Sequence, residues 1–302
     1  MNKIPVGQTI RFAYAFTFGE IGTVIGLIWI PTLAVAVISF FALRSYFPLF
    51  IDSLESGEPL TGPEAFLPLL LVIVAILVLS IVGVAISRYV LGQIQGPVFA
   101  HFAFGAAELR AFGGLVGLIF LINLFFIVLA LVVGVLAAVV GSFTKSTVLG
   151  PMIAAGVDLA ALAGLLFVIY AAVRLSFLLV PSAIEEGQYG MTKSWLLTRG
   201  NFWRIVAVGV STLLPLELVR EIAISAIIGP NMAPAMMTSA KDVAGLLRFL
   251  AQQLRAVQPQ MPLWMGISFV ISPLQYGLMF SASAFAYRAL SGGASTPKRN
   301  ES

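Results

Sequence analysis

Four charged residues within apolar stretches are the first candidates for chemistry. Glu217, Arg220 and Glu221 fall in one apolar run, and Asp158 lies near the start of another. A charge in a segment that crosses hydrocarbon is costly, and it commonly lines a polar pathway or pairs with another charge. On a helix, residues three and four apart share a face, so the first three can form ion pairs. This predicted outer polar cluster is either an ion-pair network or the lining of an external pocket, and it consists of Asp158, Glu217, Arg220 and Glu221.

The polar segment 181–204 is a second candidate, because it interleaves cations with large aromatic and aliphatic side chains. Such a segment is typical of the lipid headgroup layer, where each cation near an anionic surface contributes about 1 kcal/mol. It is either a topology anchor or a headgroup-selective site. Together with the arginine one turn before Pro181, the candidate headgroup contacts are Arg174, Lys193, Arg199, Arg204, Trp195 and Trp203.

Several kinds of active site are excluded by composition. Cysteine is absent and His101 is the single histidine, which argues against a thiol nucleophile, a zinc site or a haem. Adjacent glutamates at 185 and 186 resemble those of some intramembrane proteases, but that chemistry needs histidines on other helices. No Walker-type or dinucleotide-binding motif is present. We therefore expect a protein that is not an enzyme, with no catalytic residue, cofactor or metal.

The elements that must hold these residues are long apolar runs. Of the 302 residues, 60% are hydrophobic and 10% charged, against roughly a quarter charged in soluble domains. The mean hydropathy is +1.03. About 20 helical residues cross a bilayer, and six runs are long enough. The predicted spans are 21–43, 67–87, 114–140, 153–180, 205–228 and 264–288.

These runs predict an all-α membrane helix bundle, with residues 1–290 as one six-helix domain and 291–302 as a disordered tail. A β-barrel is excluded because the runs are continuous rather than alternating. A four-helix alternative, with 205–288 partly interfacial, stays open because that region carries charges and prolines. The first run is too long for a cleavable signal peptide and is expected to be a span.

Basic residues in the flanks predict the orientation. Eleven of the 17 lysines and arginines fall on the side of the termini and six on the other. The loop 45–66 carries four acidic residues and no basic one. Because positive flanks stay in the cytoplasm, we expect both termini there.

Residues 241–257 place apolar side chains at helical spacing, with Arg248 and Arg255 on other faces. We expect a surface-lying amphipathic helix between the last two spans, either a lid over an outer cavity or a passive helix facing lipid. Polar and aromatic segments that resemble one another precede the first, third and fifth spans at intervals of about 90 residues, which suggests three repeated hairpins with interfacial elbows.

Small residues recur at four-residue steps in the fourth span, at Gly156, Ala160 and Gly164. Such a stripe allows helices to approach closely. It serves either the bundle itself or a homo-oligomer.

The stretch from Arg174 to Ile205 resembles bacterial six-helix proteins related to the membrane domain of glycerophosphoryl diester phosphodiesterases. The matching positions are Arg174, Pro181, Ser194, Trp195, Leu197, Thr198, Arg199, Gly200, Phe202, Trp203 and Arg204. The motif covers about a tenth of the chain. The soluble catalytic domain of that group is missing here, so the resemblance implies the six-helix layout and an envelope or lipid-related role, without phosphodiesterase activity.

The leading functional expectation is a non-enzymatic protein of the bacterial inner membrane that organises envelope or lipid, with membrane lipids as its partners and no nucleic acid. A small transporter or permease is the alternative, because prolines interrupt three spans and charges lie in the fifth. A membrane-embedded enzyme would have to use carboxylates such as Asp158 and Glu217.

Overall fold

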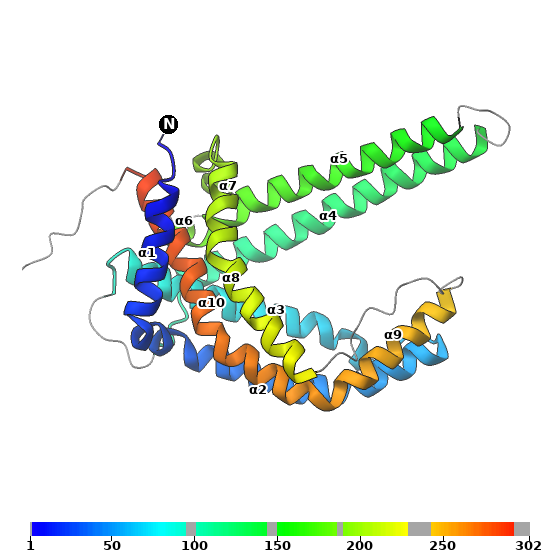
Figure 1. The fold of residues 1–302 in the computed structure, drawn as a ribbon, viewed down its shortest axis with the longest axis horizontal. Coiled ribbons are helices and arrows are strands. Elements are labelled where there is room, and N and C mark those ends of the chain that lie inside the picture. Colours follow the sequence, from blue (N-terminus) through cyan, green and yellow to red (C-terminus); the bar gives the residue numbers. More distant parts are fainter. Residues whose placement is uncertain (1, 95–100, 144–149, 186–189, 229–242, 293–302) are drawn as a thin grey trace, which may run out of the picture.

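The described parts of the chain fold into helices (Figure 1). This computed structural model describes residues 2–94, 101–143, 150–185, 190–228 and 243–292. No strand occurs among these residues. The α-helices are α1 (Val6–Gly19), α2 (Ile21–Ser56), α3 (Leu67–Val90), α4 (Ala106–Phe143), α5 (Gly150–Ser176), α6 (Leu179–Glu185), α7 (Met191–Leu197), α8 (Phe202–Ile228), α9 (Val243–Val257) and α10 (Met261–Leu290). Two short 3-10 turns, Pro63–Phe66 and Gln258–Gln260, precede α3 and α10.

Within the described part of the chain, six stretches of helix are long and apolar enough to cross a membrane. They are Ile21–Ser56, Pro63–Val90, Ala106–Gly141, Ala155–Ser176, Phe202–Ala226 and Gly245–Leu290. The all-helical, six-span prediction is confirmed, and the four-helix alternative is not needed because α8 and α10 are both full-length. The predicted tail falls mostly on 293–302, outside the described residues.

The span boundaries differ from the predicted ones in physically simple ways. α2 runs 13 residues beyond the predicted end at Leu43, because the helix continues through Arg44, Ser45 and even Pro48. It ends at Ser56, before Gly57, which takes a left-handed conformation (φ 74°). α4 begins at Ala106 rather than at 114, so the predicted second elbow is part of the span. The first and third elbows are separate helices, α1 and α7.

Helix α10 is the central element of the bundle and contacts α1, α2, α3 and α8. One buried cluster joins α2, α3, α4, α6 and α10 around Leu27, Val82 and Phe280. A second joins α1, α8 and α10 around Ala13, Val208 and Tyr287. Both clusters lie in the body of the molecule, where these helices meet.

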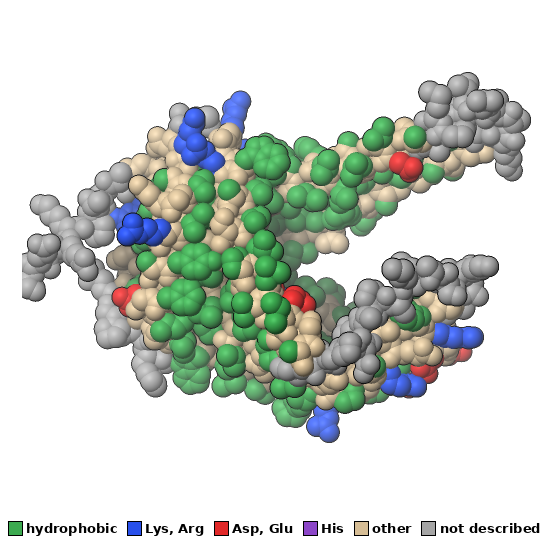
Figure 2. Space-filling model, in the orientation of Figure 1, with side chains coloured by type: hydrophobic (Ala, Val, Ile, Leu, Met, Phe, Trp, Pro, Cys, Tyr) green, Lys and Arg blue, Asp and Glu red, His purple; other side chains and the backbone are tan. Residues whose placement is uncertain are grey.

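Two arms extend from this body (Figure 1). One is the hairpin of α4 and α5, which pack on each other. The other is formed by the distal parts of α2, α3 and α10 with α9. The surface of the hairpin is largely apolar: Phe120, Ile127, Leu131 and Leu159 are each more than 60% exposed, and Figure 2 shows hydrophobic side chains along its length. An apolar surface of this extent fits contact with lipid rather than water.

Proline-containing helices leave carbonyls that other elements must satisfy. Pro215 in α8 has no N–H for the carbonyl of Ser211, four residues earlier. The hydroxyl of Tyr14 in α1 donates to that oxygen at 3.0 Å. In α10, Pro273 likewise frees the carbonyl of Phe269, which accepts from the hydroxyl of Ser272 at 2.8 Å. The proline kink in α8 is therefore one of the points where α1 is fastened.

The substitution Tyr14→Phe is expected to lower the stability of the folded protein by about 0.5–2 kcal/mol, because a carbonyl in an apolar setting loses its donor. In a Pro215→Ala background the same substitution should cost much less, since residue 215 then supplies the N–H. Thermal unfolding of the four proteins in detergent measures this coupling. Equal costs of Tyr14→Phe in both backgrounds would contradict the assignment.

Candidate functional site

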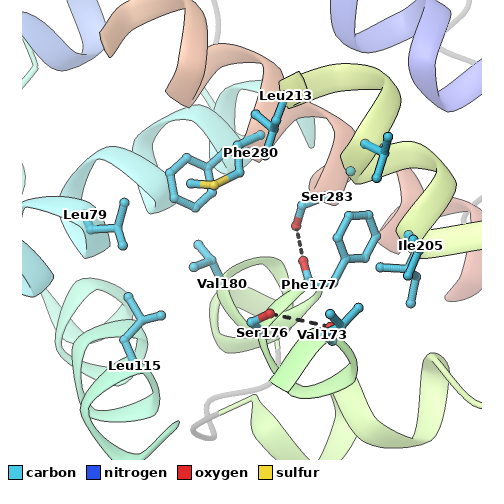
Figure 3. A pocket seen from close by; sticks show the side chains of 14 residues that line it. Leu79, Leu115, Val173, Ser176, Phe177, Val180, Ile205, Leu213, Phe280 and Ser283 are labelled. Carbon is cyan, nitrogen blue, oxygen red and sulfur yellow. Dashed lines mark hydrogen bonds between the residues drawn. The ribbon is translucent and has the colours of Figure 1, made fainter. Parts of the chain in front are cut away.

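The connection between α5 and α6 is the point where the predicted fourth span is broken. Pro181 cannot donate to the carbonyl of Phe177, and its ring crowds that oxygen, so the helix ends at Ser176 and restarts at Leu179. The hydroxyl of Ser283 in α10 donates to the freed oxygen of Phe177 at 2.6 Å (Figure 3). The prediction of one continuous helix over 153–180 is therefore wrong at its end. A side chain from α10 supplies the hydrogen bond that the broken helix lacks.

Ser194 in α7 satisfies two more backbone groups at the break between α5 and α6. Its hydroxyl donates to the carbonyl of Arg174 at 2.7 Å and accepts from the N–H of Leu178 at 3.3 Å. A side-chain oxygen thus stands between two backbone groups that would bond directly in a continuous helix. Thr198, one turn later in sequence, also donates to the Arg174 carbonyl at 3.3 Å.

Each of the three guanidinium nitrogens of Arg174 donates a hydrogen bond to the protein. The guanidinium donates to the hydroxyl of Tyr170 at 2.9 Å, to the hydroxyl of Thr198 at 3.2 Å and to the carbonyl of Trp195. Its carbon lies 3.8 Å from the centre of the Trp195 ring, a cation–π contact. Arg174 is 5% exposed. The predicted headgroup contact therefore has a structural role here: it clasps α5 to α7. We call these residues, with Ser194, the arginine clasp.

The other predicted headgroup residues divide into engaged and exposed ones. Arg204 donates to the carbonyl of Ile4 at 2.7 Å, and Lys193 lies 5.4 Å from the ring centre of Tyr287. Arg199 is exposed, and Trp203 is 78% exposed. Arg199 and Trp203 thus stand at the surface next to the clasp, where their contact with headgroups stays a prediction.

An apolar cavity of about 460 Å³ lies beside the clasp, between the hairpin and the body (Figure 3). α3, α4, α5, α6, α8 and α10 all contribute to its wall. Apart from Ser176 and Ser283 its lining carries no polar side chain. The lining residues are Leu79, Leu115, Val173, Ser176, Phe177, Val180, Ile205, Val206, Gly209, Val210, Leu213, Met279, Phe280 and Ser283. We call it the hairpin cavity.

The structure separates the predicted outer polar cluster into three contacting residues of α8 and Asp158 of α5. Arg220 bonds Glu217 at 2.9 Å and Glu221 at 3.4 Å, all within α8. Gln275 in α10 donates to Glu217 at 2.9 Å and ties the two helices together. Asp158 is an exposed residue of α5, on the hairpin arm, and takes no part in these contacts. The two carboxylates that an embedded enzyme would need together, Asp158 and Glu217, are therefore on separate elements.

A buried ion pair near the start of α4 was not predicted from the sequence. Glu108, 1% exposed, bonds Arg88 at 3.0 Å and accepts from the N–H of Gly105 at 2.9 Å. A glutamate three residues inside a helix start is a known signal for such capping. Burial lowers the pKa of His101, which the Glu108 carboxylate opposes and Arg88 reinforces. The N–H of His101 donates to the carbonyl of Gly26 at 3.2 Å, so this loop is fastened to α2.

The three small residues of the stripe on α5 differ in what surrounds them. A Cβ added at Gly164 would come within 2.4 Å of Leu129, so this glycine allows α4 and α5 to approach each other. Gly156 has no atom within 4 Å of such a Cβ, and Ala160 is exposed. The hairpin thus uses one member of the stripe, and a homo-oligomer through the other two stays a prediction.

Comparison of the chain with family models, with curated proteins and with solved structures finds no match. The resemblance of the Arg174–Ile205 stretch to the phosphodiesterase membrane domains stays a prediction. The structure gives several residues of this stretch a physical role. Arg174, Ser194, Trp195 and Thr198 form one hydrogen-bonded cluster.

We expect Arg174→Lys to destabilise the protein strongly although it keeps the charge. A lysine ammonium cannot form the planar set of bonds and the stacking contact that the guanidinium makes. Each buried polar partner left unsatisfied costs about 1–3 kcal/mol. Thermal unfolding in detergent checks this, with the exposed Arg199→Lys as the matched control. Equal melting temperatures for the two variants would show that the clasp does not stabilise the fold.

Proposed function

We propose that this protein is a non-enzymatic membrane protein that binds a phospholipid of its own bilayer and thereby contributes to lipid or envelope organisation. The observation that carries the proposal is the hairpin cavity, with its apolar lining and its position between two groups of membrane-spanning helices. The occupant we assign to it is an acyl chain.

The size and lining of the cavity favour such a chain. Its volume of about 460 Å³ lies within the range of about 300–1,000 Å³ typical of small-molecule sites. Of its two hydroxyls, that of Ser283 is occupied by the Phe177 carbonyl, and that of Ser176 lies 3.5 Å from the carbonyl of Val173. A polar ligand would find few partners there, whereas an apolar chain gains from burial.

Groups suited to a lipid headgroup lie close in sequence to residues that line the cavity. Ile205 and Val206 line it from the first turn of α8. Trp203 lies two residues before Ile205 in α8, and Arg199 lies in the connection before α8. A tryptophan ring and a cation at a bilayer boundary are the side chains that hold interfacial lipid groups. A lipid with its chain in the cavity can therefore place its phosphate near Arg199.

The transporter alternative has one supporting observation. Glu217 and Gln275 form a polar contact between α8 and α10, close to Pro215 in one helix and Pro273 in the other. Polar groups beside interrupted helices are typical of transport sites. In this structure, however, Arg220 and Gln275 already satisfy Glu217, and the hairpin cavity beside α8 is apolar.

We also propose that the end of the molecule bearing the clasp faces the cytoplasm. Lysine and arginine side chains gather around this end of the body in Figure 2. Arg11, Arg110, Arg199, Arg204 and Arg288 belong to the helices or connections that meet there. Positive flanks favour the cytoplasmic side of the bacterial inner membrane, which would place both termini there.

Filling the hairpin cavity should displace the acyl chain. Gly209 lines the cavity and has no atom within 4 Å of an added Cβ, so Gly209→Phe puts a ring into the open space. A phospholipid carrying a photoactivatable group at the end of its chain should crosslink to α8 of the native protein in nanodiscs. We expect about a tenfold loss of this crosslink in the variant, equivalent to about 1.4 kcal/mol.

Gly134→Phe is the matched control, because Gly134 is exposed on α4 and also has open space around it. It should leave the crosslink to α8 unchanged. If Gly209→Phe and Gly134→Phe retain equal crosslinks and equal melting temperatures, the cavity does not hold the chain.

The orientation is testable with single cysteines, since the chain has none of its own. We expect a maleimide that cannot cross membranes to label Glu58→Cys, in the loop after α2, on intact spheroplasts. It should label Arg199→Cys only after permeabilisation. The reverse pattern would invert the proposed topology.

A further inference from the structure

A second cavity lies on the far arm, remote in sequence from the clasp. It has a volume of about 550 Å³ and is enclosed by α2, α8, α9 and α10. Leucine, phenylalanine and other apolar side chains make up its wall, with two exceptions, Glu221 and Gln253. We call it the α9 cavity.

The amphipathic helix α9 is held in place as one wall of this cavity. Its Leu250, Leu254 and Val257 line the space. On another face Arg255 bonds Glu55 at 3.1 Å and approaches Asp52 to 3.7 Å, both in α2. Of the two roles predicted for this helix, lid or passive helix, the structure favours the first, because α9 covers a space rather than lying alone on the surface.

The charge at this cavity is not balanced. Glu217 is satisfied by Arg220 and Gln275, each at 2.9 Å. Glu221 has a longer contact with the same arginine, 3.4 Å, and its side chain is 62% exposed. Two carboxylates and one guanidinium leave a net charge of −1 beside an apolar hollow. A carboxylate in a spanning helix is stabilised by a cationic partner, and Glu221 shares its partner Arg220 with Glu217.

We infer that the α9 cavity binds an amphiphile that has an apolar chain and an ammonium head, with the chain against α9 and the ammonium on the carboxylate of Glu221. The chain gains from burial in the apolar wall. The ammonium supplies the positive charge that Arg220 alone does not, and the ring of Trp264 in the same lining adds a surface that attracts cations. An anionic or neutral head would lack this complementarity.

Two sources supply this chemistry: the headgroup of an aminophospholipid such as phosphatidylethanolamine, and a free lipophilic amine. Both place an ammonium at the end of an apolar body. The site is independent of the hairpin cavity, because the two cavities share no lining residue.

The test uses the full chain in nanodiscs of phosphatidylglycerol and two photoactivatable probes with the same dodecyl chain. One probe ends in an ammonium and the other in a hydroxyl. We expect the ammonium probe to label α9 and the start of α10 about tenfold more than the alcohol. Glu221→Gln should abolish this preference without reducing labelling by the alcohol. Equal labelling by both probes in the native protein, or an undiminished preference in Glu221→Gln, would overturn the inference.

Three controls sharpen the result. Glu58→Gln removes an exposed carboxylate outside the spanning helices and should keep the preference for the ammonium. Gly209→Phe, which fills the hairpin cavity, should also keep it, so this inference and the proposed function can fail separately. Adding phosphatidylethanolamine to the nanodisc identifies the source: competition with the probe indicates the phospholipid headgroup, and its absence indicates a free amine.

Discussion

A carbonyl freed by proline in an apolar segment needs a donor, and this need fixes much of the architecture. Hydrocarbon offers no hydrogen bond, so a donor from the protein stabilises such an oxygen. Ser283 does this for Phe177, Tyr14 for Ser211 and Ser272 for Phe269. The first two bonds join different helices. They therefore fasten α10 to the end of α5 and α1 to the middle of α8.

In the arginine clasp, side chains likewise satisfy backbone groups, here where the chain turns from one span into the next. Between Ser176 and Phe202 the chain must end one span, turn along the boundary and begin the next. Ser194 bridges the interrupted backbone, and Arg174 stacks on Trp195 while bonding its carbonyl. Because these contacts hold the end of α5, the rest of the hairpin can diverge from the body and leave space for the hairpin cavity.

The sequence predicted well those features that depend on local pattern. The six spans follow from apolar length, and α9 follows from the spacing of its leucines. That Pro215 frees a carbonyl follows from the residue type alone. What could not be predicted is which distant group takes it, since Tyr14 lies about 200 positions away and no local rule links the two.

The candidate site was harder to predict for a related reason. A cation beside aromatic residues at a boundary has the same sequence pattern whether it faces headgroups, as Arg199 can, or is buried, as Arg174 is. Asp158 and Glu217 were expected to lie at similar depths in the membrane. Similar depth does not show whether two helices are neighbours there, and α5 diverges from α8. Glu108 had a recognisable position at a helix start, and only the fold brings Arg88 to it.

The length of α4 has a consequence for the bilayer itself. With 38 residues the helix is about 57 Å long, nearly twice the hydrocarbon thickness of about 30 Å. Its apolar surface continues through most of that length, so an upright position would expose oily side chains to water at one end or both. The hairpin must therefore recline at a steep tilt or thicken the membrane around it. A tilt leaves the bilayer thickness unchanged, whereas thickening would deform the lipids next to the hairpin.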